Sequence, residues 1–198
     1  MEKFNTHSGI AAPLYQANIN TDVIIPIKRL VGTARDGLGR YAFEPWRFHD
    51  DGSENPEFVL NQADYRNASI LIAGANFGCG SSREGAVWAL ADFGFRCVIA
   101  PSFGGIFYGN CLQSGLLPVV LPEDQVRRLI AGSNFLNIDL EARLVISKGA
   151  APLPFEIDDA RRTKLMQGLD DIGMTLRRGA EITDFQDRDR QVRPWIWQ

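Results

Sequence analysis

A glycine-rich stretch at residues 77–84 carries the side chains of this sequence that are best suited to chemistry. Ser81 and Ser82 supply two hydroxyls, and Arg83 supplies a guanidinium beside them. A guanidinium can hold a carboxylate or a phosphate through two parallel hydrogen bonds. The stretch therefore predicts an anion-binding site, and a plain turn leading into a capped helix is the competing interpretation.

Two predicted elements position this stretch. The apolar run at 69–73 is typical of a buried strand, and residues 86–91 are typical of a helix. Gly78 and Gly80 allow positive φ angles and a close approach of the backbone to a ligand. The helix is expected to begin near Arg83 with one of the two serines as its cap, and its free N–H groups favour anions. The stretch does not match the P-loop, the dinucleotide fingerprint or the nucleophile elbow.

Length and composition predict one domain over residues 1–198, with a flexible tail from about residue 187. The content of hydrophobic residues is 45%, which is enough for a full core. A net charge of −3 gives no electrostatic case for binding nucleic acid. A membrane span is not expected either, because no apolar run reaches the roughly 18 residues that it needs.

The cysteines indicate a reducing compartment. Cys79, Cys97 and Cys111 are widely spaced and odd in number, so we expect free thiols and a cytoplasmic location. The N-terminus has no secretory leader pattern. Closely spaced thiolates of the kind that hold an iron–sulfur cluster do not occur, and His7 and His49 are isolated. We therefore expect this chain to bind no metal by itself.

The remaining elements predict an α/β layer that continues into a β-rich portion on the same core. Expected strands lie at 96–100, 116–121, 137–141, 143–147 and 153–157, with helices from 106, over 123–130 and over 159–166. The charged end at 187–198 contains Trp195 and Trp197, a composition frequent in protein interfaces. A frayed terminus is the alternative.

The stretch at 76–84 closely resembles the signature of the swivel domain of the aconitase superfamily, in particular its family of 3-isopropylmalate dehydratase small subunits. Further blocks that resemble this family follow in the same order at 20–26, 46–48, 100–103, 106–110, 116–119 and 168–173. The resemblance thus covers nearly the whole chain. It implies an α/β fold, the three-layer β/β/α swivelling domain of the aconitase type.

The resemblance also implies a reaction, in which a small carboxylate of the malate type is reversibly dehydrated and rehydrated. By residue matching, Ser81 would be the base, acting as an alkoxide, and Arg83 would assist it. Ser82, Arg83, Arg35 and Thr21 would bind the substrate, and for Thr21 a role in stabilising a turn is the alternative. The resemblance places a [4Fe-4S] cluster on a separate large subunit, so this chain would work as part of a heterodimer or a higher hetero-oligomer.

Substrate choice is expected to depend on the loop at 28–40, which is rich in glycine and cations. Leu30, Val31 and Leu38 are candidates for an apolar pocket, and a solvated surface loop is the alternative. The chain departs from the family pattern at four positions near the site: Asn20, Ile27, Arg29 and Gly85. These departures leave open a related hydro-lyase acting on 2-methylmalate or citraconate, homoaconitate or citrate.

Two other classes of function remain open from the sequence. One is a non-catalytic module that binds or senses anions. The other is a purely structural partner, which would be favoured if Ser81 and Arg83 lay buried in a closed core.

Overall fold

The chain folds around a seven-stranded mixed sheet in the computed structural model, which describes residues 1–32 and 34–197. The strands are β1 (Thr6–Leu14), β2 (Ile70–Ala73), β3 (Cys97–Ala100), β4 (Leu117–Val120), β5 (Phe135–Asp139), β6 (Leu144–Ser147) and β7 (Leu153–Pro154). Their order in the sheet is β4-β3-β2-β1-β5-β6-β7. Neighbouring strands from β1 to β4 are parallel, whereas β1–β5, β5–β6 and β6–β7 are antiparallel.

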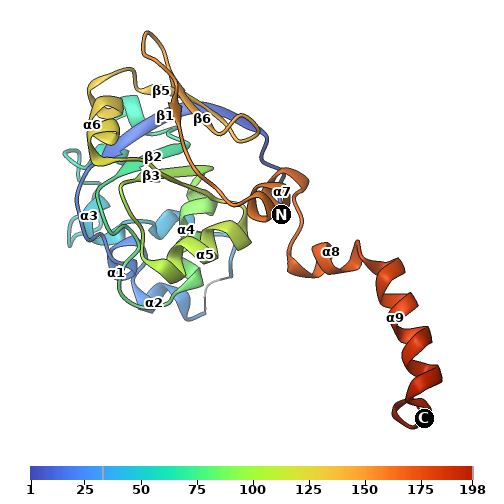
Figure 1. Ribbon diagram of the computed structural model, residues 1–198. Coiled ribbons are helices and arrows are strands. Elements are labelled where there is room, and N and C mark those ends of the chain that lie inside the picture. The colour runs from blue at the N-terminus through green and yellow to red at the C-terminus, as the bar shows by residue number, and fades with distance from the viewer. Residues whose placement is uncertain (33, 198) are drawn as a thin grey trace.

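Helices connect the parallel strands and cover the sheet (Figure 1). They are α1 (Thr21–Ile24), α2 (Ile27–Leu30), α3 (Glu44–Arg47), α4 (Glu84–Phe93), α5 (Gly105–Ser114), α6 (Glu123–Ala131), α7 (Asp159–Gln167), α8 (Asp171–Leu176) and α9 (Gly179–Val192). Short 3-10 turns are η1 (Gly39–Tyr41), η2 (Val59–Asn61), η3 (Ala63–Tyr65) and η4 (Pro194–Ile196). The helices α4 and α5 lie between β2 and β3 and between β3 and β4, so the predicted alternation is confirmed.

Both faces of the sheet are buried, as expected for a sheet with parallel strands at its centre. Along β2, Ile70 and Ile72 join one hydrophobic cluster, while Leu71 and Ala73 point to the other. The cluster on the Leu71 side includes the inner faces of α1, α4 and α5. The opposite cluster includes β5, β6, α6 and α7. The predicted β-rich portion therefore shares the core of the parallel strands, and the expected α/β fold is confirmed.

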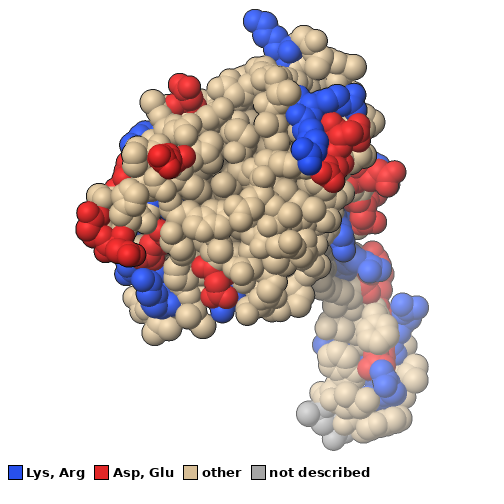
Figure 2. All heavy atoms as spheres, turned by 90° about the vertical axis from the view of Figure 1, so that its left-hand side faces the viewer, with Lys and Arg blue, Asp and Glu red and all other residues tan. Residues whose placement is uncertain are grey.

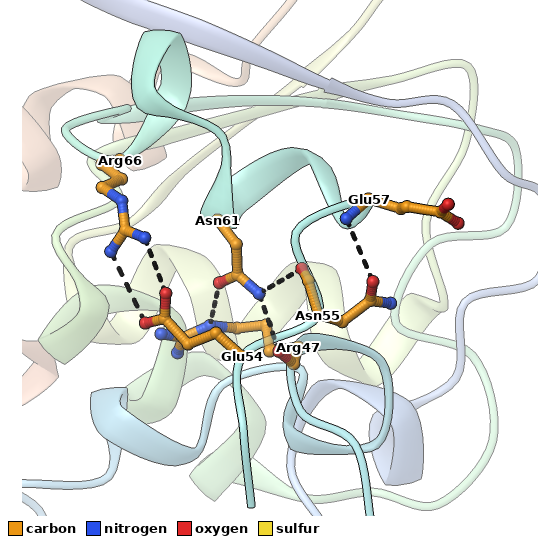
Figure 3. Close-up of polar contacts among 6 residues, drawn as sticks. All are labelled: Arg47, Glu54, Asn55, Glu57, Asn61 and Arg66. Atoms are coloured by element: carbon orange, nitrogen blue, oxygen red, sulfur yellow. Dashed lines mark hydrogen bonds and ion pairs between the residues drawn. The ribbon is translucent and has the colours of Figure 1, made fainter.

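A polar network holds the long segment between α3 and β2 in place (Figure 3). Asn61 is buried, and its Nδ2 donates to the carbonyls of Arg47 at 2.7 Å and Asn55 at 2.8 Å. Arg66 Nη2 donates to a carboxylate oxygen of Glu54 at 2.6 Å. Because a buried amide is costly without partners, Asn61 fixes the path of this segment. The segment in turn packs into the core through Phe58 and Leu60.

The C-terminal part differs from the rest of the chain. Beyond α7, the helices α8 and α9 extend away from the sheet (Figure 1). The helix α9 continues to Val192, past the point where a tail is predicted, and the last predicted tail residue, Gln198, lies outside the described residues. A single domain over 1–198 and a flexible tail stay predictions. In the described part of the chain, no helix is both long and apolar enough to cross a membrane.

Candidate functional site

The site residues lie where three parallel strands end. The strands β1, β2 and β3 are parallel neighbours, so the segments 15–20, 74–83 and 101–104 all leave the sheet at the same edge. Ligands of open α/β sheets are usually bound outside the carboxyl ends of the strands. The fold therefore brings the glycine-rich stretch to the edge where a ligand site is expected.

The backbone of the motif loop, residues 76–83, is held from both sides. On one side, Gly78 N–H donates to the carbonyl of Ile19 at 2.8 Å. On the other side, Phe77 forms an isolated parallel bridge with Phe103, and the ring of Phe77 is fully buried. The loop is thus a rigid part of the sheet edge.

Gly78 is required where the loop crosses α5. Its φ is +71°, a conformation that side chains rarely adopt, and a Cβ built at this position would lie 2.2 Å from Cγ of Phe107. Phe107 is itself buried in the core, with its ring 5.4 Å from that of Phe77. An alanine at 78 would therefore strain the backbone and also displace a packed ring.

We predict that Gly78→Ala destabilises the protein by about 2–4 kcal/mol, the sum of the backbone and packing costs. The matched control is Gly149→Ala, because Gly149 also has a positive φ, +80°, but its Cβ would have no heavy atom within 4 Å. The control should lose only about 1 kcal/mol. Chemical denaturation of both variants measures the difference. Equal losses would contradict the close contact between the loop and Phe107.

The two serines of the motif loop are exposed on the surface. The prediction that one of them caps the following helix is wrong, because α4 begins at Glu84 and its N-cap residue is Arg83, which makes no side-chain cap. Arg83 is extended, with φ −117° and ψ 107°, so the serines lie too early in the chain to occupy the cap position. Among the described residues, neither serine hydroxyl has a hydrogen-bond partner, so both are available to a ligand.

Thr21 fastens the motif loop from the start of α1. Its N–H donates to the carbonyl of Cys79 at 3.0 Å, and its Oγ1 donates to the carbonyl of Ser81 at 3.0 Å. Thr21 is only 1% exposed. It therefore positions the backbone that carries Ser81, whereas its predicted contact with a substrate stays a prediction.

Arg83 is oriented by the residue that follows Thr21. The side chain of Asp22 forms an ion pair with Nη1 of Arg83, and the Arg83 side chain is only 16% exposed. Asn20 fixes the start of α1 by accepting a hydrogen bond from Val23 N–H at 2.9 Å. This pairing fixes the guanidinium next to Asp22 at the start of α1 and leaves Nε and Nη2 without a partner among the described residues. The group can therefore still bind an anion.

The loop predicted to select the substrate lies along α4. At its start, Leu30 packs where Gly85 has no side chain, since a Cβ at 85 would lie 2.4 Å from Cδ2 of Leu30. At its end, Asp92 Oδ2 accepts hydrogen bonds from Gly37 N–H at 2.8 Å and Gly39 N–H at 2.6 Å. Gly85, which departs from the family pattern, is therefore matched to Leu30, because Leu30 fills the space that a larger residue at 85 would need.

Between these two fixed points, Arg35 lies against the middle of α4. Its Cζ is 5.0 Å from the centre of the Trp88 ring, and its side chain is exposed. Thr33, in the same loop, lies outside the described residues. Val31 is 78% exposed, which leaves it available to a ligand, but Leu38 is 1% exposed. The prediction that Leu38 lines a substrate pocket is wrong, because this side chain is part of the core.

The contacts of Thr21 with Ser81 and of Asp22 with Arg83 therefore tie Ser81 and Arg83 to the start of α1, with Ser82 between them in the chain. Arg35 approaches this group only through α4. Neither Asp22 nor Asp92 is predicted by the sequence to belong to the site. The only sequence signal for Asp92 is its place on the Gly85–Trp88 side of α4, one turn after Trp88.

Within this group Ser81 and Ser82 are exposed at the surface, whereas Arg83 is mostly covered and Thr21 is buried. Hollows of about 490 and 770 Å³ lie around α3, and both are lined by Phe48 and His49. The larger one is also lined by Lys28, Arg29 and Arg40 of the loop predicted to select the substrate. Within the described residues, there is no cluster of three or more His, Cys, Asp or Glu side chains that could hold a metal. Burial raises the pKa of the Cys97 and Cys111 thiols, which disfavours the thiolates that an iron–sulfur cluster needs. These two buried thiols do not fit such a cluster.

Comparisons with known proteins confirm the expected fold of the aconitase type. A sequence profile described as the aconitase C-terminal domain matches residues 1–124, and one described as the C-terminal domain of the 3-isopropylmalate dehydratase small subunit matches residues 171–196. The crystal structure of a 3-isopropylmalate dehydratase from Methanocaldococcus jannaschii superposes with a TM-score of 0.69 at 25% identity, covering 90% of this chain and 98% of that one.

Curated relatives match over the full length. A 3-isopropylmalate dehydratase small subunit from Rhodospirillum rubrum is 50% identical over 99% of this chain and 97% of its own length. One from Gluconacetobacter diazotrophicus is 52% identical over 98% of this chain and 97% of its own length. The chain therefore belongs to the family of 3-isopropylmalate dehydratase small subunits.

Proposed function

We propose that this chain, together with a large subunit, interconverts 2-isopropylmalate and 3-isopropylmalate by dehydration and rehydration, a step of leucine biosynthesis. The relatives at about half identity are named 3-isopropylmalate dehydratase small subunits, and they align with this chain over nearly its full length. The observation in the structure that supports the proposal most is the exposed Ser81 hydroxyl, which is free of partners among the described residues and lies beside a fixed arginine. A reducing cytoplasm suits the free cysteines of the chain.

Ser81 acts in this proposal as the base. In the forward direction, one carbon of the substrate loses its hydroxyl, and Ser81 Oγ takes the proton from the neighbouring carbon, which leaves a double bond between the two. On rehydration, the hydroxyl is added to the carbon that lost the proton, and a proton is added to the carbon that lost the hydroxyl. A serine hydroxyl is a weak acid, so its anion needs support from the Arg83 guanidinium and the N–H groups at the start of α4.

Arg83 and Ser82 hold a carboxylate of the substrate. The guanidinium has donors left after pairing with Asp22, and the Ser82 hydroxyl is exposed beside it. Arg35 serves as a second carboxylate clamp from the loop along α4. Thr21 contributes by fixing the main chain at Ser81 and through the substrate contact that the family resemblance implies.

The other half of the site belongs to the large subunit. The leaving hydroxyl needs a Lewis acid, which the family resemblance assigns to a [4Fe-4S] cluster on that subunit. The exposed position of Ser81 and Ser82 supports this division, because a closed pocket would require a second surface over them.

A second candidate is a related hydro-lyase for another alkylmalate or a tricarboxylate, such as 2-methylmalate, homoaconitate or citrate. The packing of Leu30 at Gly85 supports this second candidate, because Gly85 departs from the family pattern next to the loop that would choose the substrate. The exposed apolar side chain of Val31 instead favours an alkyl group such as isopropyl. One methylene in such a pocket is worth only about 1–3 kcal/mol, so activity on close analogues is expected.

Reconstitution tests the proposal. We expect the isolated chain to be inactive, and the pair of chain and large subunit to convert 2-isopropylmalate with a higher kcat/KM than 2-methylmalate, homocitrate or citrate. Absorbance of the dehydrated intermediate gives the rates. Turnover by this chain alone would contradict the division of the site, and a preference for citrate would select the second candidate.

A further inference from the structure

The loop at 28–40 is held at its first end by the start of α3. Arg29 donates to both carboxylate oxygens of Glu44, from Nε at 2.8 Å and from Nη2 at 2.7 Å. The next residue, Leu30, packs at Gly85 of α4. The path of the loop is therefore fixed up to Leu30.

The middle of the loop is exposed. Gly32 and residues 34–36 lie at the surface. Gly32 and Gly37 have positive φ angles of +79° and +104°, and a Cβ built on either would have no heavy atom within 4 Å. Arg35 makes no hydrogen bond or ion pair among the described residues, and its Cζ lies 5.0 Å from the centre of the Trp88 ring. Because an exposed contact of this kind is weak, the position of Arg35 depends on the backbone around it.

Asp92 fixes the backbone nearest to Arg35. Its Oδ2 accepts hydrogen bonds from Gly37 N–H at 2.8 Å and from Gly39 N–H at 2.6 Å. Packing also holds Gly39, which is buried and so close to α4 that a Cβ there would lie 2.4 Å from the backbone nitrogen of Phe93. Gly37 has no such packing, because the space around it is open. The bond from Asp92 is therefore what fixes Gly37, two residues from Arg35.

The helix α4 connects this anchor to the proposed reaction site. It begins at Glu84, directly after Arg83, and Asp92 lies in its last turn. Because a helix rises about 1.5 Å per residue, Asp92 lies roughly 12 Å along the axis from Glu84. The cation at Arg83 and the anchor of the loop thus sit at the two ends of one rigid element.

Individual cations matter in this protein because its charge is mixed. Figure 2 shows acidic and basic side chains in small mixed groups on the face that it draws. The net charge of the chain is −3, so it does not attract anions overall. Binding of a dicarboxylate therefore depends on single cations that are held in the correct place.

We propose that Asp92 is a positioning residue, which holds Arg35 where it can bind a carboxylate of the substrate. The proposal rests on the function proposed above, in which Arg35 is the second carboxylate clamp. When a ligand binds only one arrangement of a loop, its apparent Kd rises in inverse proportion to the population of that arrangement. Release of Gly37 lowers this population, so Asp92 acts on substrate binding and not on the chemical step.

The test compares Asp92→Ala with Asp158→Ala. Asp158 is a matched control, because it is also exposed and one of its oxygens also accepts two backbone N–H groups, at 3.0 and 3.1 Å, but at the start of α7. In the pair with the large subunit, we expect Asp92→Ala to raise KM for 2-isopropylmalate about tenfold and to keep kcat within about twofold. Asp158→Ala should change neither constant by more than about twofold. Asp92→Asn keeps an acceptor oxygen, so its KM should stay within about threefold.

A double variant shows whether Asp92 acts through Arg35. In an Arg35→Ala background, Asp92→Ala should raise KM by less than about twofold, because the side chain that it positions is gone. The same tenfold rise in both backgrounds would mean a purely structural role and would overturn the proposal. A KM for Asp92→Ala no higher than that for Asp158→Ala would also overturn it.

Amide hydrogen exchange of the full chain tests the anchor without any turnover. Exchange at Gly37 N–H should be about tenfold faster in Asp92→Ala and unchanged in Asp158→Ala. An unchanged rate in Asp92→Ala would contradict the anchor. If the rate rises as expected but the unsubstituted pair converts none of the malates, the hold of Asp92 on the loop stands and the proposed function fails.

Discussion

Replacing Ser81 by alanine should lower kcat of the assembled enzyme by about a thousandfold. The reason is that Ser81 Oγ is the group expected to take the proton, and a positioned general base contributes about 10²–10⁴-fold to a rate. Assembly should be unaffected, because the loop is held by backbone contacts at Gly78 and Ser81 that do not involve the Ser81 side chain. Steady-state kinetics and titration with the large subunit measure the two effects separately.

Ser82→Ala is the matched control for this variant. It removes the same atom from the neighbouring exposed residue, which is expected only to donate a hydrogen bond to a carboxylate. A hydrogen bond to a charged group is worth about 1.5–3 kcal/mol, so KM should rise about tenfold to a hundredfold with kcat nearly kept. If Ser81→Ala behaved like Ser82→Ala, with most of the rate retained, Ser81 could not be the base.

Replacing Arg83 by lysine should lower kcat/KM by about a hundredfold, chiefly through KM. The ammonium keeps the charge but loses the planar pair of donors, and it cannot both pair with Asp22 and grip a carboxylate in the same geometry. Stability should change little, since an ion pair with a half-exposed carboxylate contributes little to folding. Kinetics across a range of substrate concentrations separates KM from kcat.

Arg128→Lys provides the control for this substitution. Arg128 also pairs with a carboxylate, that of Asp124, but on the exposed side of α6, which covers the opposite face of the sheet from α4. It should leave both kinetic constants within about twofold. An Arg83→Lys enzyme with an unchanged KM would remove Arg83 from substrate binding.

Much of the fold could be predicted because the strands are short apolar runs between glycines and prolines. β2, β3 and β4 were each expected to within a residue or two, and α7 ends at Gly168 as its left-handed conformation, φ +67°, demands. The resemblance of separate sequence blocks to one family then supplied the arrangement of these elements. Local pattern and global fold agree here, as expected for a natural sequence.

The prediction that a serine caps α4 is wrong for a local reason. A cap is predicted from residue type, yet the position of the cap depends on the backbone, and Arg83 stays extended up to Glu84. The sequence could not show this, because the motif loop is shaped by the strand neighbours that hold it at Ile19 and Phe103.

The partners of the site residues could not be predicted either. Asp22 and Arg83 are 61 positions apart, and they meet only because β1 and β2 are parallel neighbours that end at the same edge. Leu38 was expected in a pocket because it lies in a polar loop, but η1 packs it against α4 and into the core. Such outcomes depend on tertiary packing, which residue type and spacing alone do not contain.

The position of Ser81 in the assembled enzyme tests the account most directly. A structure of this chain bound to the large subunit with 2-isopropylmalate should place Ser81 Oγ about 3–3.5 Å from the carbon that loses its proton, the distance of a reactive contact. It should also show Arg83 bonded to a carboxylate of the substrate. A Ser81 hydroxyl that faces away from that carbon, with a side chain of the large subunit at that distance instead, would contradict the account.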